Sequence, residues 1–132
     1  GDISITTDDL AVAEGGIVLS TVPATGASAA GVGVATGSLL IDRGSIQTLN
    51  GASSLGGGIS IETDTAVITS GVGAVPIATA AGAAGGAGDI SLNATGEVEL
   101  RSGGAISSVA LANSSGDAGE IALVAGGTLS MA

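Results

Sequence analysis

Short stretches of this chain alternate apolar and polar residues, which is the period-two pattern of half-buried β-strands. In residues 88–92 (GDISL) every second side chain from Ile90 onward is aliphatic, and residues 97–100 (EVEL) continue the alternation. A third run at residues 105–111 completes the unit, and Gly and Asn stand where sharp turns need unusual backbone angles. The pattern predicts three strands per unit, and therefore a three-sided coil.

The same strands recur along the chain at a fixed step of 31 residues. The step relates three aliphatic columns and one glycine column: Ile59, Ile90 and Ile121; Ile61, Leu92 and Leu123; Val67, Val98 and Leu129; Gly57, Gly88 and Gly119. A fixed period in this range is typical of a solenoid, in which each repeat buries its apolar side only by stacking on its neighbours. We therefore expect an all-β fold, a parallel β-helix with three strands and about 31 residues per coil.

The whole chain divides into repeats of this kind, and we expect it to be one β-solenoid segment within a longer rod. The repeats cover residues of about 1–31, 32–56, 57–87, 88–118 and 119–132. The second repeat is the shortest and the least regular. Low-complexity runs of Ala, Gly, Ser and Thr end the repeats, at residues 24–33, 78–88 and 112–119. We expect these runs to be loops that leave the coil along one edge of the rod.

The apolar positions of the strands predict which side chains fill the inside of the coil. The expected core residues are Ile3, Ile5, Leu10, Val12, Leu39, Ile41, Ile59, Ile61, Val67, Ile90, Leu92, Val98, Leu100, Ile106, Ile121, Leu123 and Leu129. They are all Ile, Leu or Val, residues that stack well in ladders between similar rungs. Burying each one contributes about 1.5 to 3 kcal/mol to folding.

Composition and charge exclude several classes of function. The 132 residues include no Phe, Tyr, Trp, Cys or His and only two basic residues, Arg43 and Arg101, so the formal net charge is −10. Two arginines cannot supply the counterion release that drives nucleic-acid binding, and the negative charge repels anionic membrane surfaces. The longest uncharged stretches, residues 15–41 and 65–88, are rich in Gly and lie on the strand register. We therefore expect neither nucleic-acid binding nor membrane insertion.

The repeat pattern from residue 88 to residue 121 resembles a known family. It reads Gly-Asp-Ile-Ser-Leu, then Val-Glu-Leu, then Gly-Gly-Ala-Ile-Ser-Ser, then Ser-Ser-Gly-Asp-Ala-Gly-Glu-Ile. This is similar to the repeats of filamentous haemagglutinin-like exoproteins, the two-partner-secreted adhesins. The resemblance implies a right-handed parallel β-helix, export across the outer membrane of a Gram-negative bacterium or cyanobacterium, and a role in adhesion or surface structure. The Asn-Pro-Asn-Gly type motif of that family's secretion domain is not recognisable.

Candidates for catalysis are few. Glu97 and Glu99 lie on one face of a strand, and a pair of carboxylates is what glycoside hydrolysis needs. Sugar sites generally also need aromatic platforms and cationic anchors, which this chain almost lacks, and a chain without His has no Ser-His-Asp arrangement. We therefore interpret the two glutamates as part of a solvated outer face and expect no enzyme activity.

Calcium is the one cofactor that the sequence leaves open. Asp89 and Glu120 occupy the same repeat position, so their carboxylates are expected about 5 Å apart on adjacent coils, a repulsion that a cation would relieve. Residues 85–89 (GGAGD) have a single match to the glycine-aspartate nonapeptides of calcium β-rolls. Diffuse counterions are the alternative. Asn93 and Asn113 begin Asn-x-Ser/Thr tripeptides, which are either glycan acceptors or turn residues.

The sequence is best explained as a non-catalytic structural segment of an extracellular bacterial adhesin or surface filament. An ice-binding solenoid is a rival, but the threonines expected to point outward, such as Thr6, Thr63 and Thr95, do not form a sustained ladder. A calcium-binding module is a second rival. Open strand edges at both ends predict end-to-end continuation or self-association, and adhesion implies a receptor or glycan on a host or other cell surface.

Overall fold

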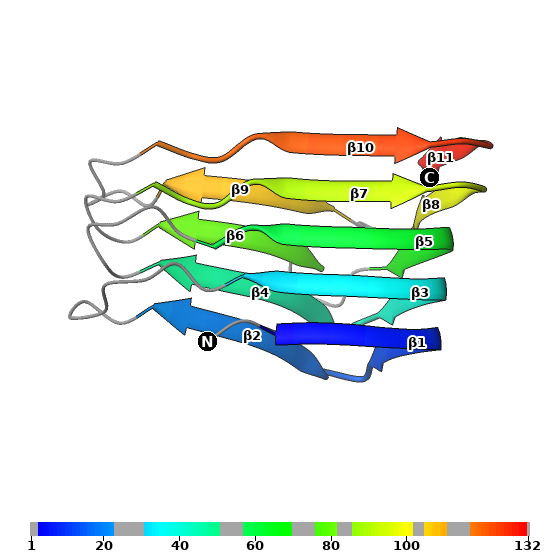
Figure 1. Cartoon of the computed structure of the whole chain (residues 1–132), viewed down its shortest axis with the longest axis horizontal. Coiled ribbons are helices and arrows are strands. Elements are labelled where there is room, and N and C mark those ends of the chain that lie inside the picture. The colour runs from blue at the N-terminus through cyan, green and yellow to red at the C-terminus, as the bar shows by residue number, and fades with distance from the viewer. Residues whose placement is uncertain are drawn as a thin grey trace.

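The protein folds as a parallel β-solenoid. The computed structural model describes residues 3–22, 31–50, 57–69, 76–81, 86–101, 105–110 and 117–131. Every regular element within these ranges is a β-strand, and the paired strands are parallel. The chain runs along the near side of the molecule, returns along the far side and rises at each pass, which makes the coil right-handed (Figure 1). The predicted all-β, parallel architecture is confirmed. Among the described residues no helix could cross a membrane.

Eleven strands form two sheets. In the seven-stranded sheet, sheet A, the order is β1-β3-β5-β7-β10, with β8 and β11 extending it around a corner, and the four-stranded sheet, sheet B, has the order β2-β4-β6-β9. The strands of sheet A are β1 (Ile3–Ala13), β3 (Val32–Asp42), β5 (Ile59–Thr69), β7 (Ile90–Ala94), β8 (Val98–Arg101), β10 (Ile121–Ala125) and β11 (Leu129–Met131). The strands of sheet B are β2 (Ile17–Val22), β4 (Ser45–Asn50), β6 (Ile77–Ala81) and β9 (Ile106–Ala110).

Three sides are present in each full turn, as the alternating pattern predicts. In the fourth coil they are the separate strands β7, β8 and β9, whereas in the first three coils the first two sides are joined in one strand of 11 residues. Ile3 pairs with Val32, Val32 with Ile59, Ile59 with Ile90, and Ile90 with Ile121. The coil length is therefore 29, then 27, then 31 twice, so the predicted step of 31 applies only to the later coils.

One predicted core residue, Val67, is wrong. Val98 pairs with Ala66, and Val67 pairs with Glu99, so Val67 lies half-buried on the outside while Ala66 and Ile68 point inward and are almost fully buried. The cause is one extra residue at the turn between β7 and β8. The step between the third and fourth coils is 31 before this corner and 32 after it. Carrying the 31-residue step past the corner displaces the alternation by one position.

The middle coils bury a continuous stack of aliphatic side chains. Most predicted core residues belong to it, together with four that the pattern missed because the boundary of the second coil was misplaced or a loop was expected: Val32, Val34, Ile46 and Ile77. Burial decreases toward both ends of the stack. Of the predicted core residues, Ile3, Ile5, Leu10, Ile106 and Leu123 are only partly buried. Ile121 and Leu129 are wrong as core residues, at 46% and 44% exposed, because no further coil covers them.

The loop predicted at residues 78–88 is partly wrong, since β6 continues to Ala81. In this strand Ile77, Thr79 and Ala81 are buried, and the residues between them are half-buried. The alanine-rich composition of the stretch conceals this alternation. Small side chains here still pack inside a narrow coil, so low complexity does not by itself indicate a loop.

The repeating glycines mark places where adjacent coils approach each other closely. A Cβ atom added to Gly88 would lie 2.1 Å from the carbonyl oxygen of Gly57, and one added to Gly119 would lie 2.3 Å from the carbonyl oxygen of Gly88. Both distances are much shorter than a carbon–oxygen contact. The glycine column of the sequence is therefore a requirement of the stacking, since these positions have no room for a side chain.

A row of hydroxyl groups runs through the coil on the inward side of sheet B. Ser20, Thr48, Thr79 and Ser108 share one position in the register of this sheet. Thr48 Oγ1 donates to the carbonyl oxygen of Gly57 at 2.9 Å, and Thr79 Oγ1 donates to that of Gly88 at 2.7 Å. In the next coil the amide of Gly119 donates to Ser108 Oγ at 2.7 Å. The hydroxyls thus connect the end of each sheet B strand to the start of the following coil.

We expect Thr79→Val to destabilise the protein by about 1 to 3 kcal/mol. The substitution keeps the shape of a side chain that is 0% exposed but removes the donor to Gly88 and the partner of Ser108 Oγ, which lies 2.8 Å away. Urea denaturation would measure the loss. The matched control is Thr6→Val on the exposed side of β1, which should change stability by less than about 0.5 kcal/mol. Equal effects would argue against a structural role for the buried hydroxyl.

Candidate binding face

The outer surface of sheet A carries the most distinctive polar chemistry among the described residues. One outward column consists of small residues, and the column beside it is mixed, with one acid and one amide. The first contains Ser4, Gly33, Ser60, Ser91 and Ala122, and the second contains Thr6, Ala35, Glu62, Asn93 and Val124. Strand pairing places Glu62 directly beside Asn93, so a carboxylate and an amide meet near the middle of this surface.

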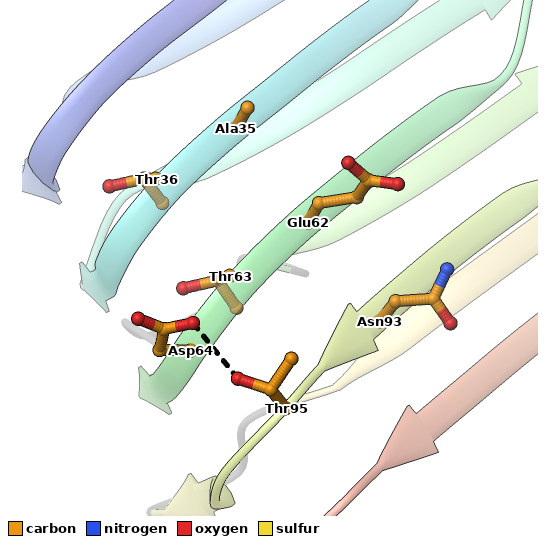
Figure 2. Close-up of a pocket in the computed structure, with 7 residues that line it drawn as sticks. All are labelled: Ala35, Thr36, Glu62, Thr63, Asp64, Asn93 and Thr95. Carbon is orange, nitrogen blue, oxygen red and sulfur yellow. Dashed lines mark hydrogen bonds between the residues drawn. The ribbon is translucent and has the colours of Figure 1, made fainter.

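Two shallow depressions adjoin each other on this face and share Ala35 and Glu62. The larger, of about 370 Å³, is lined by Ala35, Thr36, Glu62, Thr63, Asp64, Asn93 and Thr95 (Figure 2). The smaller, of about 270 Å³, is lined by Ser4, Ile5, Thr6, Gly33, Val34, Ala35, Ser60 and Glu62. Both are open toward solvent, so a bound molecule would lie across the sheet and would not be enclosed.

The hydrogen bonds at the larger depression decide which groups face a ligand. Thr95 Oγ1 donates to Asp64 Oδ1 at 2.9 Å, a contact between adjacent coils that is drawn in Figure 2. Thr63 is 4% exposed, and its hydroxyl donates to the carbonyl oxygen of Thr65 at 2.8 Å. Glu62 and Asn93 are exposed and extend from neighbouring strands. The face therefore presents mainly oxygen acceptors, together with one amide.

The position of Thr63 corrects one expectation from the sequence. Thr63 was expected to point outward, but it lies inside the corner of β5, where the alternation of buried and exposed residues shifts by one. Thr6 and Thr95 are exposed, but they lie at different register positions. The described outer columns of sheet A thus contain no continuous row of threonines of the kind that ice-binding solenoids use.

The two arginines lie away from this depression and interact with acids of their own surroundings. Arg43 Nε lies 3.4 Å from Asp42 Oδ1, and Arg43 Nη2 lies 3.8 Å from Glu14 Oε1. Arg101 Nε donates to Glu99 Oε1, and this hydrogen bond, together with the negative charge of Glu99, raises the pKa of Arg101. Glu99 is thus bound to a cation beside it. Its predicted partner on the same strand face, Glu97, is exposed and precedes β8.

Asp89 and Glu120, the candidate calcium ligands, lie on adjacent coils as the repeat predicts. Asp89 Oδ1 accepts a hydrogen bond from the backbone amide of Glu120 at 2.7 Å, so a protein donor already compensates this carboxylate. Calcium takes six to eight oxygen ligands. Within the part of the chain that the structure describes, no three residues of the types His, Cys, Asp and Glu gather into a metal site. These two residues alone do not provide a calcium coordination sphere.

Sequence reasoning missed Glu62 and Asp64, which define the larger depression. Their only signal was two acids in one strand, the same signal that drew attention to Glu97 and Glu99. Asn93, one of the two glycan-acceptor candidates, lies beside them and is exposed in β7. The other candidate, Asn113, lies outside the described residues.

No protein-family model, curated protein or solved structure matches this chain significantly. The resemblance to filamentous haemagglutinin-like repeats therefore rests on the repeat pattern of the sequence alone.

Proposed function

We propose that this chain is a non-catalytic structural segment of an extracellular bacterial adhesin or surface filament, in which it acts as a stiff spacer. The observation that carries the proposal is the unbroken stack of aliphatic residues through the middle coils, bounded by sheets whose strands pair only with the coils before and after them. A rod is the direct product of such pairing. The open outer surfaces favour contact with large partners over enclosure of a small substrate.

Stiffness follows from how the load is distributed. Pulling along the axis strains the hydrogen bonds of several strand pairs in each coil, and β1 and β3 alone pair over nearly the whole 11 residues. The aliphatic ladder and the buried hydroxyl row oppose sliding of one coil on the next. Each coil adds about 4.8 Å of length, so many repeats of this kind would carry a binding element far from the cell.

The partners we propose follow from the two kinds of surface. At the last coil, β10 and β11 expose aliphatic side chains, including Ile121, Leu129 and Met131, and their outer edges have no described strand beside them. A further coil, either covalently continuous or from a second copy, would cover them. A receptor or glycan on a host or other cell surface would bind across the acidic face around Glu62.

Localisation in the source organism tests this proposal. Immunogold electron microscopy with an antibody against the chain should label extracellular filaments or the outer surface of intact cells, and proteinase K added to intact cells should remove the label. A cytoplasmic marker protein, which should survive the protease, is the control. Label confined to the cytoplasm would contradict the proposal.

The rival binding functions have direct measurements of their own. Thermal hysteresis at millimolar protein concentration would indicate ice binding. A saturable rise of Tm with CaCl2, absent with MgCl2 of equal ionic strength and lost in Asp89→Asn, would indicate a calcium site. We expect neither result, and we expect both salts to raise Tm alike by screening a formal charge of −10.

A further inference from the structure

The charges of this protein are separated by face. The strands of sheet B, β2, β4, β6 and β9, contain no Asp, Glu, Lys or Arg. The uncharged sequence extends well beyond them, over residues 15–41, 44–61, 65–88 and 102–116. All 12 acids therefore lie elsewhere, on the strands of sheet A and at their ends. In a chain of net charge −10, one complete side of the coil is neutral.

This neutral side is also largely apolar. Its two outward columns are Leu19, Gln47, Ala78 and Ser107, and Thr21, Leu49, Ala80 and Val109. Leu19 is 46% exposed, Leu49 is 41% exposed and Val109 is 39% exposed. Alanines lie between them, so the side chains form a low, even surface with neutral polar groups among them. Interfaces between proteins have a similar mixture, with charged residues depleted at their centres.

We propose that sheet B is a lateral interface at which two copies of this chain pack face to face. The charge distribution selects this occupant. Two copies that approach through sheet A bring like charges together, whereas pairing through sheet B places both acidic faces on opposite outer sides of the pair. Sheets packed in this way lie about 10 Å apart, and flat sheets with small side chains allow that approach. The proposal goes beyond the end-to-end contact proposed above because it uses a different surface.

The size of the surface sets the strength expected for one segment. Four strands about 4.8 Å apart, each with five or six residues of about 3.3 Å, offer about 350 Å² per copy. Two such faces bury less than the 1,200 Å² or so of a standard stable interface. The isolated segment should therefore pair only weakly. In a longer rod the contact would grow with every coil, so lateral pairing would bundle filaments.

Sedimentation velocity across 10 µM to 1 mM protein, in low and high NaCl, tests the proposal. We expect a dimer to appear as concentration rises, and to appear at lower concentration in high salt, because salt screens the repulsion between two chains of charge −10. The double variant Leu49→Lys with Val109→Lys should weaken dimerisation at least tenfold. Its matched control, Ser60→Lys with Ser91→Lys on sheet A, changes net charge equally and should dimerise at least as well as the parent. Circular dichroism would verify that both variants are folded.

A chain without cysteine permits a second, covalent measurement. Oxidation of Leu49→Cys should give a disulfide-linked dimer much faster than oxidation of Ser60→Cys. A protein that stays monomeric in every condition overturns the proposal. So does association that survives the sheet B variant but disappears in Leu123→Lys with Met131→Lys, since that result would assign the contact to the ends of the coil.

Discussion

Gly88→Ala should destabilise this protein by about 3 kcal/mol or more, or prevent its folding. The added methyl carbon would lie 2.1 Å from the carbonyl oxygen of Gly57 and 2.7 Å from the amide nitrogen of Gly58, both backbone atoms of the previous coil. Neither can move without opening the stack, because Ile59 directly after them pairs with Ile90. Overpacking against fixed atoms costs about 1 to 3 kcal/mol and sometimes more. Urea denaturation followed by far-UV circular dichroism would measure the loss.

The matched control is Gly33→Ala in β3. At this outward position the nearest atom to an added Cβ is the carbonyl oxygen of Ile3, at 4.0 Å, so the methyl group fits. Alanine also loses less backbone entropy than glycine on folding, and the variant should be as stable as the parent or slightly more stable. A similar loss in both variants would mean that the close approach of Gly88 to the previous coil does not exist.

Period and alternation carried most of the fold prediction. The aliphatic columns identify the strands, and a repeat that cannot bury its apolar side alone has to stack, which leads directly to parallel pairing. The glycine column was visible as a pattern, but its cause was not. Only the structure shows that the oxygen atom of the preceding coil occupies the place of a side chain.

The errors arise where a repeat changes length. One extra residue at the turn after Ala94 shifts the register from 31 to 32, and the alternation that includes Val67 shifts with it. The deletions in the first two coils had the same consequence for Val32 and Val34, which were absent from the expected core. A single sequence gives little information on where within a repeat an insertion falls, because either register leaves aliphatic residues on the inside.

Burial at the last coil depends on what lies beyond it. Ile121 and Leu129 continue the inward columns of Ile90 and Val98, yet they are exposed because they form the last layer. The binding face was harder still to predict. Glu62 and Asn93 are 31 residues apart and become neighbours only through the strand register. Residue type alone, in a chain without His, Cys or aromatic residues, does not mark such a site.

The second large effect is expected for Leu92→Ala, at about 2 to 5 kcal/mol, with a matched partner in the same column. Leu92 is 0% exposed between Ile61 and Leu123, so truncation leaves a cavity that the coils on both sides keep open. Leu123→Ala removes the same atoms from the last coil, where the side chain is only partly buried, and should cost less than half as much. Denaturation at micromolar concentration would compare the two variants. At millimolar concentration the costs should converge if a second copy stacks on the last coil, because Leu123 would then be buried as Leu92 is. Equal costs at micromolar concentration would contradict the open end that the structure shows.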